Sequence, residues 1–130
     1  MTRTISFTLN GDKVAAEIKP HHNLVEVLQR EFNLMGARES CGQGMCGCCT
    51  VLVNGAAVSG CLYLAAFVDG AEVTTVEHLA AAGTLSPVQQ AFIDHGGFQC
   101  GICTPGMVTA ATALLEANSQ PSEDDIKEWM

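Results

Sequence analysis

The feature that most constrains this chain is a group of cysteines set among glycines in the stretch ESCGQGMCGCCTVLVNG, residues 39–55. Four of the seven cysteines, Cys41, Cys46, Cys48 and Cys49, fall within nine residues. Adjacent cysteines form a disulfide only with strain, and clustered cysteines are typical of metal sites in chains that are not secreted. The stretch therefore predicts a metal centre built on a short loop.

Three of these cysteines have the spacing of an iron–sulfur site. The pattern Cys41-x4-Cys46-x2-Cys49 matches the first three ligands of a plant-type [2Fe–2S] cluster. Four thiolates have to converge on two irons, so the backbone has to turn tightly around them. Glycines permit positive φ and a close approach of the main chain, whose N–H groups then hydrogen-bond the sulfur atoms. The glycines in question are Gly42, Gly44 and Gly47.

The fourth ligand is expected to be Cys61, because a hairpin over residues 50–58 would carry the chain away from the loop and return it there. Cys48 is then left over, as a small side chain that happens to be a thiol. The alternative is that Cys48, rather than Cys49, is a ligand. The two-residue gap after Cys46 and a strand that starts directly after Cys49 favour Cys49.

A second cysteine pair, Cys100-x2-Cys103, lies on a loop that leads into a predicted helix. Thiolates are favoured at the N-terminus of a helix. Taken alone, this spacing fits a redox dithiol, half of a zinc site or half of a cluster site. No further cysteine follows before Met130, so the second site is incomplete within this chain.

The first part of the chain has the pattern of a sheet crossed by one helix. Alternating apolar residues flank two Asn-Gly pairs, at residues 10–11 and 54–55, and such pairs favour tight hairpins. Asn23 begins a capping box that starts a helix, and Gly36 is expected to end it. A further strand is expected over residues 72–76. Two strands, a helix and three strands are the element order of a β-grasp sheet.

Beyond a boundary within residues 80–86, only helical signals appear. Ser86 begins one helix with a capping box and a following proline. Thr104 and Pro105 repeat the cap followed by proline and begin a second helix, and Ser122 begins a third. This part of the chain is therefore expected to be all-α.

The composition excludes several other classes of function. Hydrophobic residues make up 48% of the chain, which is enough for a packed core. The formal net charge of −8 disfavours binding to nucleic acid, because a phosphate backbone repels an acidic protein. No apolar run is long enough to span a membrane, and the start alternates like a strand, unlike a signal peptide. A cytoplasmic location is expected.

Two long segments closely resemble the small iron–sulfur subunit of molybdenum hydroxylases, the xanthine oxidase family: ESCGQGMCGCCTVLVNGAAVSGCLYLA and SPVQQAFIDHGGFQCGICTPGMV. The resemblance covers essentially all 130 residues. It implies an α+β chain with a β-grasp, plant-type ferredoxin-like domain over residues 1–80 that carries one [2Fe–2S] cluster. An all-α helical-bundle domain that carries a second cluster would follow over residues 81–130.

The resemblance also implies roles for individual residues. The ligands of the first cluster would be Cys41, Cys46, Cys49 and Cys61. Cys100 and Cys103 would supply half of the second cluster, and Gln99 falls where the family approaches the molybdopterin cofactor. The family completes the second cluster with a later Cys-x-Cys pair, so the native product is expected to continue beyond Met130. Otherwise the second cluster is absent or is completed by a partner.

By the same resemblance, the chain would be the electron-transfer subunit of a molybdenum-containing hydroxylase. It would relay single electrons from the molybdopterin centre of a large subunit, through two [2Fe–2S] clusters, to FAD on a medium subunit or to a cytochrome. It would have no substrate chemistry of its own. The alternatives are a free ferredoxin-like electron carrier and a zinc-binding structural module. Visible absorption separates iron–sulfur from zinc, and co-purification with a large subunit separates a bound subunit from a free carrier.

Overall fold

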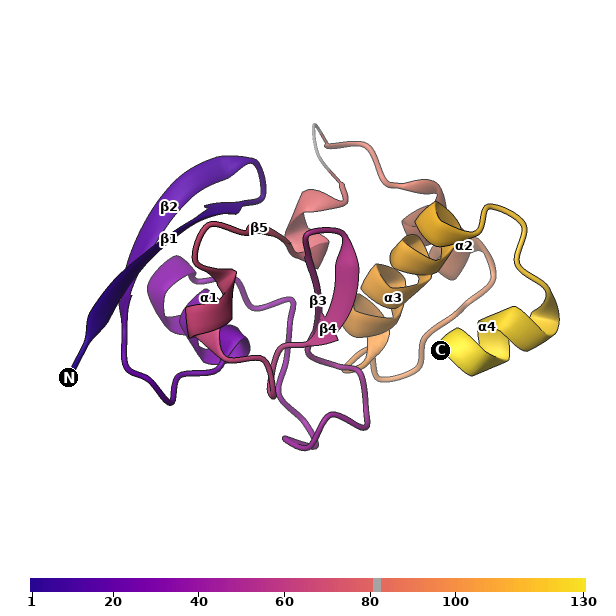
Figure 1. Cartoon of the computed structure of the whole chain (residues 1–130). Helices are drawn as coiled ribbons and strands as arrows, with labels where there is room; N and C mark the ends of the chain where they lie inside the picture. The colour runs from indigo at the N-terminus through magenta and orange to yellow at the C-terminus, as the bar shows by residue number, and fades with distance from the viewer. Residues whose placement is uncertain (81–82) are drawn as a thin grey trace.

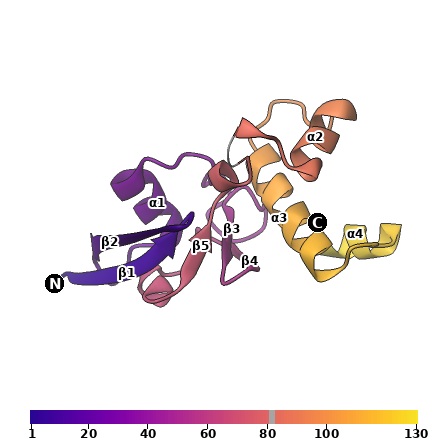
Figure 2. The ribbon, with the colours of Figure 1, turned by 90° about the horizontal axis from the view of Figure 1, so that it is seen from above.

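The computed structural model describes residues 1–80 and 83–130. A five-stranded sheet with one crossing helix forms the first part, and three helices lie beside the sheet in the second part (Figure 1). Seen from above, the first hairpin and the last helix lie at opposite ends of an elongated molecule (Figure 2). The fold is mixed α+β, as the sequence predicts. The expected boundary at residues 80–86 includes residues 81–82, which lie outside the described residues.

The last strand in the chain lies at the centre of the sheet. Its strands are β1 (Arg3–Leu9), β2 (Asp12–Ile18), β3 (Thr50–Val53), β4 (Ala56–Ser59) and β5 (Glu72–Thr74). They are ordered β2-β1-β5-β3-β4. Strands β1 and β2 form one antiparallel hairpin and β3 and β4 form the other, while β5 lies parallel to β1 and antiparallel to β3. Strand β5 therefore joins the two hairpins into one sheet.

Both hairpins turn at the Asn-Gly pairs that the sequence singles out. Asn10 and Asn54 each have a φ of 50°, and Gly11 and Gly55 have φ values of 89° and 81°. Positive φ at both central residues is the requirement of a type I′ turn, which matches the twist of the flanking strands. The two hairpin predictions are confirmed.

Helix α1 (Leu24–Phe32) covers one face of the sheet. It begins with the predicted capping box, in which Asn23 accepts from the N–H of Glu26 and the Glu26 side chain accepts from the N–H of Asn23. The core between α1 and the sheet is fully apolar. Its least exposed members are Ile5, Ile18, Leu24, Leu28, Val51, Val68 and Val73.

The prediction that Gly36 ends this helix is wrong. The last residue of α1 is Phe32, and its C-cap is Asn33, three residues before Gly36. Asn33 adopts the left-handed conformation with a φ of 55°, and Asn is one of the few residues that does so readily. Gly36 has a packing role instead. Its N–H donates to Glu77 Oε2 at 2.9 Å, and a Cβ at this position would collide with the Val76 side chain.

The second part of the chain consists of α2 (Pro87–Asp94), α3 (Thr104–Ala117) and α4 (Glu123–Trp129). The capping boxes predicted at Ser86 and Ser122 are both present. Helix α3 packs on β3 and β4 and contacts both other helices, and the indole N–H of Trp129 donates to the Ala110 carbonyl at 3.0 Å. None of the described helices is long and apolar enough to cross a membrane.

The start of α3 differs by one residue from the prediction. The N-cap is Cys103, whose carbonyl accepts from the N–H of Met107 at 3.0 Å. Thr104 is therefore the first helical residue and not the cap. Its hydroxyl is buried and has no hydrogen-bond partner among the described residues. Likewise β5 ends at Thr74 rather than at residue 76, because Thr75 leaves the sheet to bond with Asn10.

Asn10 fastens the first hairpin to the chain that follows β5. Its side-chain amide donates to Thr75 Oγ1 at 2.9 Å, and its Oδ1 accepts from the Thr75 N–H at 2.8 Å. Thr75 is only 1% exposed. Asn10→Gly keeps the positive φ but leaves both Thr75 groups unpaired. We expect the free energy of unfolding, measured by urea titration, to fall by about 2 kcal/mol.

Asn54→Gly is the matched control, because Asn54 has the same φ and its Oδ1 accepts one exposed bond, from the Glu72 N–H at 2.9 Å. We expect this variant to lose less than about 1 kcal/mol, since the freed N–H can bond with water. Equal losses in the two variants would contradict a special role for the Asn10–Thr75 contact.

Candidate metal centre

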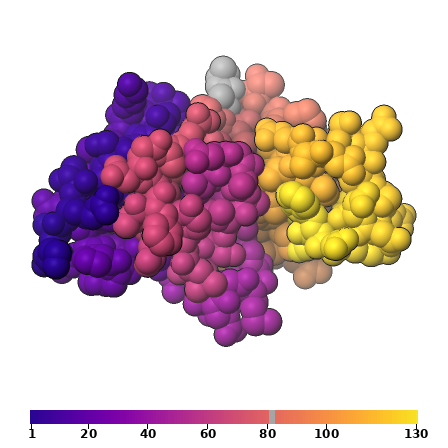
Figure 3. All heavy atoms as spheres, viewed as in Figure 1, coloured from indigo at the N-terminus to yellow at the C-terminus, as the bar shows by residue number. Residues whose placement is uncertain are grey.

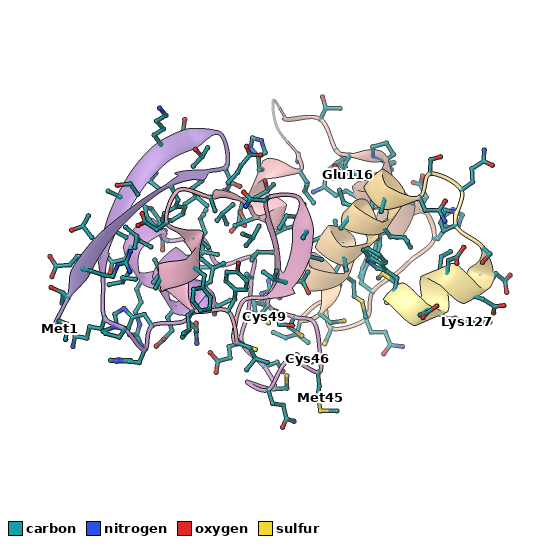
Figure 4. The ribbon with its side chains drawn as sticks, viewed as in Figure 1. Met1, Met45, Cys46, Cys49, Glu116 and Lys127 are labelled. Atoms are coloured by element: carbon teal, nitrogen blue, oxygen red, sulfur yellow. The ribbon has the colours of Figure 1, made fainter. Side chains whose placement is uncertain are left out.

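The cysteine loop connects the end of α1 to β3 and runs from solvent into the core. It protrudes at the lower edge of the molecule in Figure 3. Figure 4 shows Met45 at the outer end of the loop, with Cys46 and Cys49 successively closer to the sheet. Met45 is 79% exposed and Cys49 only 2%. The outer end of the loop is thus exposed to solvent, and its inner end is buried.

The main chain of this loop is directed at one sulfur atom. The N–H groups of Gln43, Met45 and Cys46 donate to Cys41 Sγ, over N···S distances of 3.5, 3.3 and 3.4 Å. These bonds, led by the one from Gln43, lower the pKa of Cys41 to about 6, since they stabilise the thiolate. Cys41 is therefore prepared to act as an anionic ligand.

The glycines make this arrangement of N–H groups possible. Gly42, Gly44 and Gly47 have φ values of 65°, 75° and 73°, a region that other residues avoid. At Gly44 the space is also closed, because a Cβ there would press into the Leu62 side chain. A loop with side chains at these positions could not turn its N–H groups inward.

The four cysteines expected to act together lie as two pairs. Cys41 contacts Cys46, and Cys49 contacts Cys61, whose neighbour Gly60 donates its N–H to the Cys49 carbonyl at 3.1 Å. Burial raises the pKa of Cys49 to about 11. Within residues 1–80 and 83–130, no three His, Cys, Asp or Glu side chains converge closely enough to hold one metal ion. A single zinc would need four converging ligands, whereas two thiol pairs fit a centre of two irons.

Cys48 is a buried residue of the cysteine loop. Burial raises its pKa, and the thiols of Cys46, Cys103 and Cys41 raise it further. Its thiol contacts that of Cys46, and Gly106 of α3 lies against its main chain, whereas Cys49 is in contact with Cys61. The cysteine that the sequence leaves over therefore has different neighbours from Cys49.

The second pair lies on the loop before α3. Cys100 and Cys103 are both exposed, and with Gln99 they border a hollow of about 390 Å³ lined by residues 96–101 and Cys103. Gln99 is exposed on the same loop. In the part of the chain that the structure describes, no set of three or more potential metal ligands forms at this pair.

Sequence reasoning missed two residues that connect the cysteine groups. The N–H of Arg38 donates to the Cys48 carbonyl at 3.0 Å, and its guanidinium Nη1 donates to the Gly101 carbonyl at 3.0 Å. Gly106 of α3 lies against the main chain of Gly47 and Cys48. One signal was available, because Arg38 is the only Lys or Arg between Arg30 and Lys127.

Comparison with known proteins decides the family. Residues 7–86 match the 2Fe-2S iron-sulfur cluster binding domain family, and residues 75–130 match the [2Fe-2S] binding domain family. The nicotinate dehydrogenase small FeS subunit of Eubacterium barkeri is 40% identical over 123 residues, 95% of this chain and 78% of that protein. The structure of quinoline 2-oxidoreductase from Pseudomonas putida 86 matches with a TM-score of 0.95 and 37% identity, over 99% of this chain and 80% of that chain.

The chain belongs to the small iron–sulfur subunits of the molybdenum hydroxylases. This confirms the family that the sequence resembles. The iron–sulfur subunit is thus an electron-transfer component of an oxidoreductase. The aldehyde oxidoreductase of Desulfovibrio gigas matches with a TM-score of 0.92 and 36% identity, over 98% of this subunit but 14% of that chain. There, the same unit is a small part of a much longer chain.

The pKa contrast between two thiols of the iron–sulfur subunit is testable in the iron-free protein. With a pKa of about 6 for Cys41 and about 11 for Cys49, Cys41 is mostly thiolate at pH 7 and Cys49 is protonated. Because only thiolates react, we expect iodoacetamide to modify Cys41 first and Cys49 last. Peptide mass spectrometry across pH 5–9 should show the Cys41 rate levelling off above pH 7. A rate that keeps rising to pH 9 would contradict the lowered pKa.

Proposed function

We propose that this iron–sulfur subunit conducts single electrons through two [2Fe–2S] clusters, between the molybdopterin centre of a large partner subunit and FAD on a medium subunit or a cytochrome. The observation that carries the proposal is the arrangement of two thiol pairs, with three N–H groups directed at Cys41. The clusters would supply the one-electron steps, and the protein would position them and exclude water.

The first cluster would be held within residues 1–80, a β-grasp domain of plant-ferredoxin type. Its ligands would be Cys41, Cys46, Cys49 and Cys61. The N–H groups exposed by Gly42, Gly44 and Gly47 offset the negative charge of the thiolates and so raise the reduction potential. Burial of Cys49 and Cys61 beneath β3 and α1 keeps water from the inner side of the site.

The second cluster would be held by residues 81–130, a helical domain. Cys100 and Cys103 supply two of its ligands, at the start of α3. The other two thiolates would come from outside these 130 residues, as the resemblance to the family implies. Gln99, exposed on the same loop, would approach the pterin cofactor of the large subunit.

The proposed partners follow from the lengths of the relatives. The unit is a small part of the Desulfovibrio gigas chain, so the catalytic machinery would lie on a large partner subunit. By the resemblance to the family, that subunit would bind molybdopterin, and a separate medium subunit would bind FAD. We place the complex in the cytoplasm. Clustered cysteines that bind metal rather than form disulfides are typical of a reducing compartment.

The decisive test is to purify the complex through a tag on this chain and to reduce it with dithionite. Two distinct S = ½ EPR signals, together with a co-purifying large subunit that contains molybdenum, are expected. A colourless preparation that contains zinc would contradict the proposal, and a red-brown chain that purifies alone under mild conditions would indicate a free carrier.

A further inference from the structure

Arg38 is in contact with both cysteine loops at once. Its main-chain N–H donates to the Cys48 carbonyl at 3.0 Å. Its guanidinium Nη1 donates to the carbonyls of Gly101 and Ile102, at 3.0 and 3.4 Å. These two carbonyls belong to the residues between Cys100 and Cys103. A single half-buried residue thus links the first cysteine loop to carbonyls that lie more than 60 positions after Arg38 in the chain.

The guanidinium is also an isolated positive charge. Arg38 is the only Lys or Arg from residue 31 to residue 126. Among the described residues, the three ion pairs involve Arg3, Arg30 and Lys127, and none of them includes Arg38. Arginine stays charged at every physiological pH, so this charge is permanent. Carbonyl acceptors fix the position of this charge, and none of these ion pairs neutralises it.

We propose that Arg38, held between the two loops by these hydrogen bonds, raises the reduction potential of the second cluster. The inference rests on the proposed function, since it assumes a cluster at Cys100 and Cys103. Arg38 is a positioning and tuning residue and not a ligand. Reduction adds a negative charge to a site of anionic thiolates, and a nearby cation stabilises the reduced form more than the oxidised form.

The main chain and the side chain of Arg38 make separate contacts. Every substitution other than proline keeps the N–H that donates to Cys48 and anchors the residue to the first loop. Only the contacts to Gly101 and Ile102 and the charge itself are lost. Arg38→Gln removes the charge, while Arg38→Lys keeps the charge but not the planar arrangement of donors. Arg3→Gln is the control, because Arg3 is an exposed arginine at the start of β1 that is paired with Asp69.

The experiment is an EPR-monitored redox titration of the purified complex carrying each variant. At the wild-type midpoint of the second cluster, we expect the ratio of reduced to oxidised second cluster to fall about tenfold in Arg38→Gln. The ratio should stay within about twofold of wild type in Arg38→Lys and Arg3→Gln. Hydrogen exchange of residues 99–103 should be faster in Arg38→Gln than in Arg3→Gln, because the carbonyl contacts are lost.

An unchanged ratio in Arg38→Gln, with both EPR signals present, would overturn the inference and leave the proposed function standing. A tenfold fall in Arg38→Lys would also overturn it, because the charge is retained there. Should Arg38→Gln fail to assemble, Arg38→Met removes the same charge and provides the same comparison with Arg38→Lys. The absence of a second signal in the wild-type complex would instead count against the proposed function. The signal of the first cluster reports whether each variant is folded.

Discussion

Cys49→Ala is expected to eliminate one of two clusters and to lower the iron content of the complex by about half, whereas Cys48→Ala leaves both clusters in place. The two cysteines are adjacent in the sequence but have different surroundings. Cys49 contacts Cys61 in the core, and the thiol of Cys48 contacts that of Cys46. A [2Fe–2S] cluster needs four thiolates, so the loss of Cys49 leaves Cys61 without its partner.

The measurement is iron and acid-labile sulfide per chain, with EPR of the reduced complex. Cys48→Ala is a matched control, because it removes the same atom from the neighbouring, equally buried residue. We expect it to cost about 1 kcal/mol of stability through a small cavity. The assignment fails if Cys48→Ala loses a signal and Cys49→Ala keeps both. That result would support the alternative in which Cys48 is the ligand.

The second large effect is expected at Gly106, in the first turn of α3. Gly106 is buried against the cysteine loop. A Cβ at this position would collide with the Gly47 carbonyl and lie 3.0 Å from the Cys48 Cα. These are main-chain atoms that no side-chain rotation can move. We expect Gly106→Ala to lower the free energy of unfolding by about 3 kcal/mol, because either α3 or the loop has to shift.

The sign of this change makes the test sharp. Glycine to alanine inside a helix ordinarily stabilises a protein by about 1 kcal/mol, which is opposite to the expected loss. Ala117→Gly, at the exposed end of the same helix, measures the helix-propensity contribution in this protein. A denaturant titration of both variants gives the comparison. A stabilised Gly106→Ala would show that α3 does not pack as closely on the loop as the structure indicates.

Much of the local structure could be predicted because its causes lie within a few residues. The capping boxes at Asn23, Ser86 and Ser122 need only a side chain and a partner three positions later. The Asn-Gly hairpins need only two residues that tolerate positive φ. Such signals are complete in the sequence itself, so the strands and helices they define appear where they are expected.

The errors occur where distant segments decide the outcome. Gly36 resembles a helix C-cap, but it is glycine because the Val76 and Glu77 side chains occupy the space beside it. Asn33 ends the helix instead. Arg38 and Gly106 show no local pattern at all, since their contacts are with residues about 60 positions away. A single sequence does not show which segments contact each other, so the sequence analysis missed the roles of these two residues.

In the candidate site, too, local features could be predicted, whereas contacts between distant segments could not. The spacing of Cys41, Cys46 and Cys49 is a local property, and the structure brings Cys41 to Cys46. The contact between Cys49 and Cys61 depends on the β3–β4 hairpin, which was also predictable. The contact of Cys48 with Gly106 was not predictable, because it requires the packing of α3 on the loop.

The insertion of β5 between β1 and β3 has a consequence for biosynthesis. β5 pairs with β1 through Thr8 and Glu72, so the central strand emerges from the ribosome after Cys61. Nascent chains therefore present five unprotected sulfhydryls before the sheet beneath them can close. Oxidants or stray metal ions would reach these groups during that interval, and iron loading belongs after translation of β5, in surroundings that keep sulfur reduced.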